Sequence, residues 1–235
     1  EPVHYFLSLG GKRLRPALVL MAADMYGFDL VRALPQAIGI EQFHNFTLMH
    51  DDIMDDSKLR RGELTVHRKW DINTAILSGD ALMIYSYQIL MSVKFKNDKK
   101  LLDFFTKTAI QVCEGQQLDI DFQKKEKVEI KDYLNMINLK TGALFAFSFS
   151  VGPLLLDRDK DEKKMYDLGI LLGQLFQIQD DYLDLFGSKK VGKQKGLDLL
   201  NNKKTYLILS FYRLASQKHL QDFKKLLYSK NKQEE

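Results

Sequence analysis

The sequence contains little cysteine and little proline. Its single cysteine, Cys113, excludes an internal disulfide framework and is compatible with a cytoplasmic protein, which is the location we expect. Four prolines in 235 residues leave long stretches in which helices can run without interruption. The sequence also has no clear series of alternating apolar and polar residues, the pattern typical of strands. These absences favour an all-α fold.

Long apolar runs and a strong net charge are absent as well. The longest apolar run, 143–156, is interrupted by serine, glycine and proline and is too short to span a bilayer, so we expect no stable membrane insertion. Lysine and arginine number 35 against 31 acidic residues, a net charge of +4, so we expect no nucleic-acid partner. A hydrophobic share of 45% is enough for a sizeable core.

Helical periodicity runs along the chain without a linker or a shift in composition. We therefore predict a single domain, residues 1–235, folded as a large helical bundle. Several segments are apolar on more than one face, which suits helices in the interior of a bundle. The predicted helices cover residues 15–27, 34–55, 71–95, 98–123, 130–155, 160–186 and 202–228.

One pattern of aspartates occurs twice in the chain. In 51–55 and again in 180–184, aspartates occupy positions i, i+1 and i+4 of an apolar, helix-periodic stretch. The first and last aspartate of each trio lie within roughly 40° of each other around the helix. Their charges repel and burial disfavours ionisation, whereas Mg²⁺ removes this cost by binding carboxylate, water and phosphate oxygens. One such cluster is compatible with a solvated helix end, but the repeated spacing favours paired metal sites.

Basic residues lie close to the first aspartate cluster. Arg60-Arg61-Gly62 offers guanidinium groups to phosphate oxygens, although salt bridges to the carboxylates are an alternative. His44 falls within roughly 20° of Asp51 on the helix and could donate a hydrogen bond to an anion. Near the start, the residues 10–16 combine two glycines with three cations but lack the spacing of a phosphate-binding P-loop. Lys140-Thr141-Gly142 predicts a kink that turns backbone carbonyls into a cavity.

The second aspartate cluster has similar surroundings. Gln177 lies on the same face as Asp181 and Asp184, and further cations follow in residues 193–204. A glycosidase pair would not need such trios, and a di-iron bundle would need Glu-x-x-His motifs on inward helices in place of aspartate trios. One cysteine and scattered histidines argue against zinc ligation. The residues fit best an anionic substrate held through Mg²⁺, with a hydrophobic tail inside the helical core.

The ordered set of motifs resembles the trans-isoprenyl diphosphate synthases, or polyprenyl synthetases, of the short-chain type. The resemblance runs from Gly10 to about Thr205. It implies an isoprenoid-synthase bundle with a central active-site cavity, usually a homodimer with three Mg²⁺ per site. Such an enzyme joins isopentenyl diphosphate to dimethylallyl, geranyl or farnesyl diphosphate and releases diphosphate. The matching segments are Gly10-Gly-Lys-Arg-Leu-Arg-Pro16, His50-Asp-Asp-Ile-Met-Asp55, Arg60-Arg-Gly62, Lys140-Thr-Gly-Ala-Leu-Phe145, Phe176-Gln-Ile-Gln-Asp-Asp-Tyr-Leu-Asp184 and Gly192-Lys-Gln-Lys-Gly-Leu-Asp198.

The resemblance also implies a role for individual residues. The metal ligands would be Asp51, Asp55 and Asp180, supported directly or through water by Asp52, Asp181 and Asp184. The residues expected to act in catalysis are Asp51, Asp52, Asp55, Asp180, Asp181 and Lys140. Isopentenyl diphosphate would be held by Lys12, Arg15, His44 and Arg61. The allylic diphosphate would contact Arg60, Lys140, Thr141, Gln177, Lys193 and Lys203.

Product length is predicted from the residues before the first aspartate cluster. In this family, the positions four and five residues earlier often close the product tunnel, and here they are Thr47 and Phe46. A single aromatic residue at the fifth position resembles synthases of C15 or C20 products, and we favour C20. Ideal helix geometry places Phe46 roughly 140° from Asp51, so a core-packing role for its ring is the alternative.

Two other functions remain as alternatives. A terpene cyclase would typically carry a different second metal motif and lack Lys12 and Arg15, and a non-catalytic subunit of a heteromeric synthase would tend to lose the aspartates. The sequence departs from the family pattern at Leu64, where proline is common, and in a slightly compressed loop before Lys193. Compared with the family, the sequence is also expected to be truncated at both ends.

Overall fold

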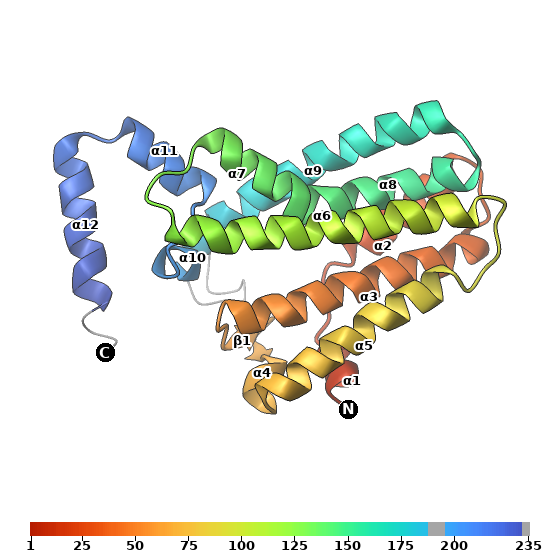
Figure 1. Ribbon diagram of the computed structural model, residues 1–235, viewed down its shortest axis with the longest axis horizontal. Coiled ribbons are helices and arrows are strands. Elements are labelled where there is room, and N and C mark those ends of the chain that lie inside the picture. The colour runs from red at the N-terminus through yellow and green to blue at the C-terminus, as the bar shows by residue number, and fades with distance from the viewer. Residues whose placement is uncertain (188–195, 232–235) are drawn as a thin grey trace.

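The computed structural model describes residues 1–187 and 196–231, and helices make up most of this part of the chain (Figure 1). The predicted all-α fold is confirmed. The principal helices are α2 (Leu14–Met25), α3 (Leu30–Met54), α5 (Ile72–Leu90), α6 (Asp98–Lys124), α7 (Ile130–Ile137), α8 (Ala143–Leu155), α9 (Asp159–Phe186), α11 (Tyr206–Leu214) and α12 (Gln217–Asn231). Shorter elements are α1 (Pro2–Ser8), α4 (Val66–Lys69), α10 (Leu197–Leu200) and the two-residue strands β1 (Leu59–Arg60) and β2 (Glu63–Leu64).

Helix α3 begins four residues earlier than the predicted start at residue 34. The Asp29 side chain caps it by accepting hydrogen bonds from the backbone N–H of Val31, at 2.8 Å, and of Arg32. Pro35 therefore lies within the helix, near its N-terminus, where few backbone hydrogen bonds are lost. The capping aspartate, not the proline, determines where this helix begins.

Three other predicted helices also need correction. The helix predicted for 71–95 ends at Leu90, and the one predicted for 202–228 is divided into α11 and α12. The helix predicted for 130–155 is interrupted by one turn of π-helix, η1 (Asn138–Gly142), between α7 and α8. The predicted kink at 140–142 is therefore a π-turn within a continuous helical path, a form often found at functional sites.

The short hairpin β1–β2 was not predicted from the sequence. Leu59 pairs with Leu64 and Arg60 with Glu63, and the turn between them places Arg61 in the left-handed region at a φ of 57°. The Tyr5 hydroxyl of α1 donates to the carbonyl of Leu64 at 2.8 Å. Two residues per strand are too few for alternation to be visible in a sequence.

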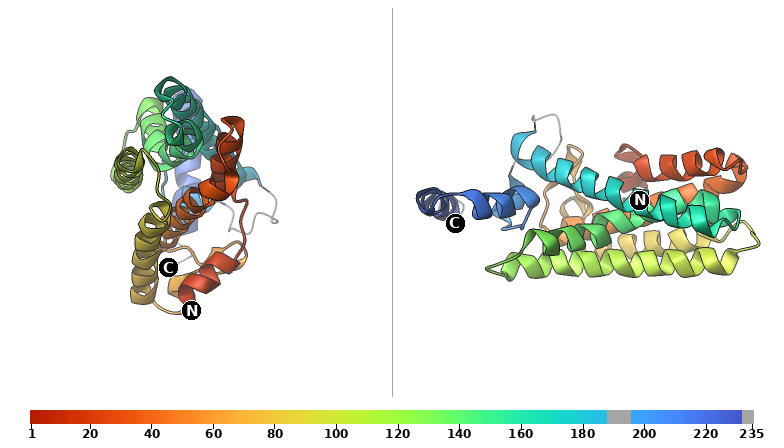
Figure 2. Two further views of the ribbon diagram at one scale, coloured as in Figure 1. Left: turned by 90° about the vertical axis from the view of Figure 1, so that its right-hand side faces the viewer. Right: turned by 90° about the horizontal axis from the view of Figure 1, so that it is seen from above.

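Helices α2, α3, α5, α6, α8 and α9 lie side by side in one bundle (Figures 1 and 2). Helix α8 packs against α2, α6 and α9, and α3 packs against α2 and α5. Phe43, Phe105 and Phe147 join α3, α6 and α8 in one fully buried aromatic cluster, with ring centroids 5.2 and 5.3 Å apart. This core anchors the helices, whose neighbouring ends surround the cavity described next.

Candidate functional site

A cavity of about 1110 Å³ is enclosed by α2, α3, the hairpin, α6, α7, η1, α9 and α10. Most of the residues singled out in the sequence line it, although they come from distant parts of the chain. Asp52 and Asp184 do not, and Lys193 lies outside the described residues. The predicted residues that do line the cavity are Lys12, Arg15, His44, Phe46, Thr47, Asp51, Asp55, Arg60, Arg61, Lys140, Thr141, Gln177, Asp180, Asp181 and Lys203.

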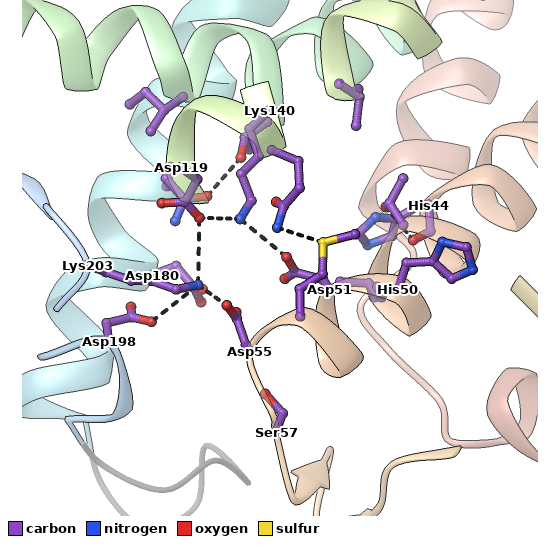
Figure 3. Close-up of a pocket in the computed structure, with 18 of the residues that line it drawn as sticks. His44, His50, Asp51, Asp55, Ser57, Asp119, Lys140, Asp180, Asp198 and Lys203 are labelled. Carbon is purple, nitrogen blue, oxygen red and sulfur yellow. Dashed lines mark hydrogen bonds and ion pairs between the residues drawn. The ribbon is translucent and has the colours of Figure 1, made fainter. Parts of the chain in front are cut away.

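Two lysines lie between the aspartates on one side of the cavity (Figure 3). Lys140 Nζ lies 2.7 Å from Asp119 Oδ2 and 3.4 Å from Asp51 Oδ1. Lys203 Nζ lies 2.6 Å from Asp55 Oδ2 and 3.7 Å from Asp119 Oδ2. Asp119 thus contacts both lysines, and we call these five residues the lysine–carboxylate cluster.

Opposite charges maintain ionisation in the lysine–carboxylate cluster. Burial by itself would lower the pKa of Lys140, but Asp51 and Asp119 more than offset this effect and raise it. The pKa of Lys203 is also raised, because the same two carboxylates and Asp55 outweigh burial. Burial and the charge of Asp51 raise the pKa of Asp55, although Lys203 opposes the shift. Both lysines are therefore cationic at neutral pH.

Asp119 is the main member of this cluster that sequence reasoning missed. It lies on α6 and is only 6% exposed, yet no aspartate pattern surrounds it. Its partner Lys140 is 21 residues away in sequence, and Lys203 is further still. The available signal was local: Gly115 and a pair of glutamines precede Asp119 in a stretch that is otherwise suited to a helix.

The second aspartate of each trio is buried and held by protein groups. Asp52 is 1% exposed and accepts hydrogen bonds from Arg60 Nε, at 3.0 and 2.9 Å, and from its Nη2, at 2.6 Å. Asp181 is 3% exposed and accepts from the Tyr133 hydroxyl at 2.6 Å and from Gln177 Nε2 at 2.9 Å. The first and second aspartates of each trio therefore have different surroundings, and only Asp51 and Asp180 of these four line the cavity without being buried.

A basic corner, formed by Lys12, Arg13, Arg15, His44 and Arg61, lies where α2 begins and the hairpin turns. Arg15 Nη1 contacts His44 Nε2 at 3.1 Å, and its guanidinium stacks on a phenylalanine ring with the charge 4.4 Å from the centroid. Arg13 forms an ion pair with Glu41, and Arg61 donates to the Gly10 carbonyl. These contacts hold the cations close together.

The basic corner has an excess of positive charge. Burial, followed by the charges of Arg15, Arg60 and Arg61, lowers the pKa of His44 well below its usual 6.5. Burial lowers the pKa of Arg15 to about 10, with Glu41 opposing the shift. Since arginine can only donate, Nε2 of the neutral His44 ring accepts from Arg15, and Nδ1 carries the ring proton. An anion entering this corner would relieve the repulsion.

The π-turn positions Lys140, and Gly115 of α6 makes room for it. A Cβ added at residue 115 would lie well inside van der Waals contact with the backbone of Lys140. On the other side, the Thr141 hydroxyl donates to Gln177 Oε1 at 2.8 Å, and Gln177 in turn donates to Asp181. The backbone of the π-turn therefore approaches α6 closely, while the Thr141 side chain reaches α9.

The remaining wall of the cavity is apolar. Phe46 is 8% exposed and its ring lies against Phe43 and His50, with centroids 5.4 and 4.9 Å apart. Thr47 donates to the His44 carbonyl at 2.8 Å. Both predicted chain-length residues lie on the cavity wall, so Phe46 is not solely a core residue. The other apolar lining side chains include Leu48, Val112, Met136, Ile137, Leu144 and Phe176.

The donor atoms suit a hard divalent cation. Asp51, Asp55 and Asp180 supply carboxylate oxygens to one cavity, and oxygen is the ligand that Mg²⁺ prefers. Within residues 1–187 and 196–231, no three acidic, histidine or cysteine residues are grouped closely enough to hold a metal by themselves. The chemistry of these residues therefore fits Mg²⁺, with further oxygens coming from water and a phosphorylated substrate. In the same described ranges, no helix has both the length and the apolar character needed to cross a membrane.

Comparison with known proteins adds independent information. The family model "Polyprenyl synthetase" matches residues 1–235. The geranylgeranyl pyrophosphate synthase of Geoglobus acetivorans is 40% identical over 211 residues, covering 88% of this chain and 66% of that protein. The chain thus spans just under two thirds of that relative's length.

Solved structures resemble the fold closely. The geranylgeranyl pyrophosphate synthetase of Pyrococcus horikoshii superposes with a TM-score of 0.88 at 39% identity, covering 95% of this chain and 70% of that one. A polyprenyl synthase from Caulobacter crescentus, in complex with calcium and isoprenyl diphosphate, gives a TM-score of 0.89 at 28% identity, with 97% and 69% covered. Sequence, fold and cavity agree, and the chain belongs to the polyprenyl synthetase family.

Proposed function

We propose that this protein is a Mg²⁺-dependent prenyltransferase that joins isopentenyl diphosphate head-to-tail to an allylic diphosphate. The observation that carries the proposal is that the basic corner, the lysine–carboxylate cluster and a set of apolar side chains all line one cavity. The cationic side chains of such a cavity can bind two anionic groups, and its apolar walls can bind a hydrocarbon chain. The names of the Geoglobus and Pyrococcus relatives support a C20 product, which we favour over C15.

We assign the allylic diphosphate to the lysine–carboxylate side of the cavity. Asp51, Asp55 and Asp180 would hold Mg²⁺, which when bound neutralises the diphosphate and stabilises it as a leaving group. Lys140 and Lys203 add positive charge beside the same oxygens. The calcium and isoprenyl diphosphate in the Caulobacter complex support a divalent cation here. A count of three Mg²⁺ per site is part of the proposal.

Several assignments made from the sequence change within this proposal. Asp52 positions Arg60, and Asp181 organises Gln177 and Tyr133, so both act through other residues and do not ligate metal directly. Asp184 does not line the cavity and is assigned at most a contact through water. Thr141 and Gln177 remain on the allylic side.

Isopentenyl diphosphate is assigned to the basic corner. Lys12, Arg15 and Arg61 supply charge, and His44 donates a hydrogen bond from the nitrogen that carries its proton. This placement directs the double bond of the bound molecule toward the allylic carbon.

The reaction then follows from the placement of the two substrates. The bond between C1 of the allylic substrate and its diphosphate oxygen breaks, and the electron pair leaves with diphosphate. The π electrons of isopentenyl diphosphate form the new bond to C1, and the proton lost from its C2 passes to the released diphosphate. The lysines stabilise the departing charge, and the apolar walls exclude water from the carbocation.

The wider setting of the enzyme is also a proposal. The exposed apolar side chains Ile76, Leu77, Ile84 and Tyr85 follow one side of α5 and suit a homodimer interface. We infer that residues 1–235 act as one domain, and the single cysteine supports a cytoplasmic location.

The test is incubation of the purified protein with Mg²⁺, isopentenyl diphosphate and dimethylallyl, geranyl or farnesyl diphosphate in turn, followed by separation of the products by length. We expect a C20 end product, and Phe46→Ala should lengthen it because a ring that closes the cavity is removed. A C15 limit would retain the reaction but contradict the assigned length. Cyclised hydrocarbon would favour a terpene cyclase, and diphosphate binding without turnover would favour a regulatory subunit. Asp51→Asn provides the inactive control.

A further inference from the structure

His50, next to the first aspartate cluster, sits in the seam between α3 and α5 and lines the cavity. Its ring lies over Gly79 of α5. A Cβ at residue 79 would lie well inside van der Waals contact with His50 Nε2 and Cδ2. The missing side chain of this glycine therefore provides the space that the imidazole occupies.

A hydrogen bond fixes the orientation of the His50 ring. Nε2 lies 3.1 Å from the carbonyl oxygen of Ile76, which can only accept, so Nε2 carries the proton. Asp80 Oδ1 lies 3.7 Å from the same nitrogen. The ring is thus attached to α5 although it belongs to α3.

The other side of the ring contacts the predicted chain-length residue. The His50 and Phe46 rings meet edge to face, with centroids 4.9 Å apart and planes at 71°. Phe46 contacts Phe43 on its other side, and Phe43 is 1% exposed within the packed aromatic core. Phe46 is therefore held between the closely packed core residue Phe43 and His50, whose side chain is 20% exposed.

We propose that His50 is a specificity-determining residue: seated on Gly79, it holds Phe46 across the end of the cavity and so limits the length of the prenyl chain. This inference rests on the proposed function. It assigns the limit to a pair of rings fixed from the neighbouring helix, not to Phe46 alone. The size of the His50 ring, and not its charge, is the property that matters.

The experiment compares the end products of the wild type and its variants with Mg²⁺, isopentenyl diphosphate and farnesyl diphosphate. His50→Ala should make the major product at least one C5 unit longer, because Phe46 loses its support and the cavity deepens. His50→Phe keeps a ring of similar size on Gly79 and should retain the wild-type length. His4→Ala, which removes an exposed histidine on α1, is the matched control and should change nothing.

Gly79→Ala provides a second, independent test. Its added methyl group would displace the His50 ring from its position over residue 79 without altering the His50 side chain itself. We expect the fraction of the wild-type end product to fall in this variant. Elongation to the wild-type length by both His50→Ala and Gly79→Ala would overturn the inference while leaving the proposed function intact. Absence of elongation by the wild type itself would instead overturn the proposed function. If His50→Ala is inactive, the Gly79→Ala product distribution decides.

Discussion

At the scale of single residues, lysines and carboxylates pair with one another on one side of the cavity. Lys140 and Lys203 neutralise aspartates that we assign to Mg²⁺, and Asp119 contacts both lysines. If a cation and an anionic substrate bound together, the aspartates would pair with the cation and the lysines with the anion. No buried charge would then lack an opposite charge beside it. Asp119 keeps a negative partner beside the lysines in either state.

Replacing Asp119 with asparagine should therefore affect both stability and binding. The side chain is nearly fully buried, so its loss leaves two lysines without one partner, and we expect a decrease of about 1–3 kcal/mol in the free energy of unfolding. Urea titration measures the decrease, and Asp121→Asn, a more exposed site on the same helix, should change stability little. Equal effects at the two positions would contradict the role assigned to Asp119.

The pH dependence of stability should reflect His44. Its folded pKa is depressed, so its stabilising contribution is complete above the unfolded pKa of 6.5 and is lost as pH falls toward the folded pKa. We expect the free energy of unfolding to fall by about 1.4 kcal/mol per pH unit from this residue in that window. Urea titrations at several pH values between 7.5 and 5.5 give the free energy of unfolding as a function of pH. This free energy should depend less on pH in His44→Gln than in the wild type. Identical slopes in the two proteins would exclude the burial effect.

At the scale of helices and turns, the sequence predicted the existence of the long helices better than their interruptions. Apolar periodicity identified the segments that became α2, α3, α6 and α9 to within a few residues at most ends. The sequence predicted an irregularity at Lys140–Gly142 but not that it is a π-turn, because its shape depends on the close approach of α6 at Gly115. Two-residue strands leave no periodic signal at all.

The site was predicted to a similar degree. Repeated spacing revealed the two aspartate trios, since neighbours on one helix are visible in a sequence. The division between cavity-facing Asp51 and buried Asp52 was not visible, because it depends on Arg60 folding back through the hairpin. Asp119 was missed for the same reason: its partners come from other helices.

Substituting Gly115 with alanine should test the close approach of α6 and the π-turn. The added methyl group meets the backbone of Lys140, which cannot rotate away, so η1 must move from α6. We expect a loss of about 1–3 kcal/mol in stability and weaker diphosphate binding, as Lys140 is drawn off Asp119. Calorimetric titration with diphosphate and Mg²⁺ measures the second effect. Lys107→Ala, exposed on α6, is the control and should match the wild type in both assays.

At the scale of the whole molecule, the charges of the cavity couple ligand binding to folding. Mg²⁺ alone would compete with Lys140 and Lys203 for carboxylates. Diphosphate alone would be attracted by the basic corner but repelled by Asp51 and Asp55 on the lysine–carboxylate side. Bound together, Mg²⁺ and diphosphate neutralise each other and both sides of the cavity. The folded state should therefore be stabilised by the pair far more than by either component.

Thermal unfolding with Mg²⁺, diphosphate, both or neither tests this coupling. At a diphosphate concentration about 100 times its dissociation constant in the presence of Mg²⁺, we expect stabilisation of about 2.7 kcal/mol. The rise in Tm with both should exceed the sum of the separate rises, and Asp51→Asn should abolish the excess. Strictly additive shifts would show that the two ligands bind without contact.

The fixed spacing of residues along helix α3 has a further consequence. This one helix carries His44 of the basic corner, Phe46 of the apolar cavity wall and Asp51 of the lysine–carboxylate cluster. At about 1.5 Å per residue, Phe46 and Asp51 are separated by about 7.5 Å along the axis. In the proposed prenyltransferase, a bulky residue moved one turn along this helix would change the length of the product while Asp51 and Asp55 stay in place. A lineage of such enzymes can thus diversify its products by exchanging single side chains and inherit its chemistry unchanged.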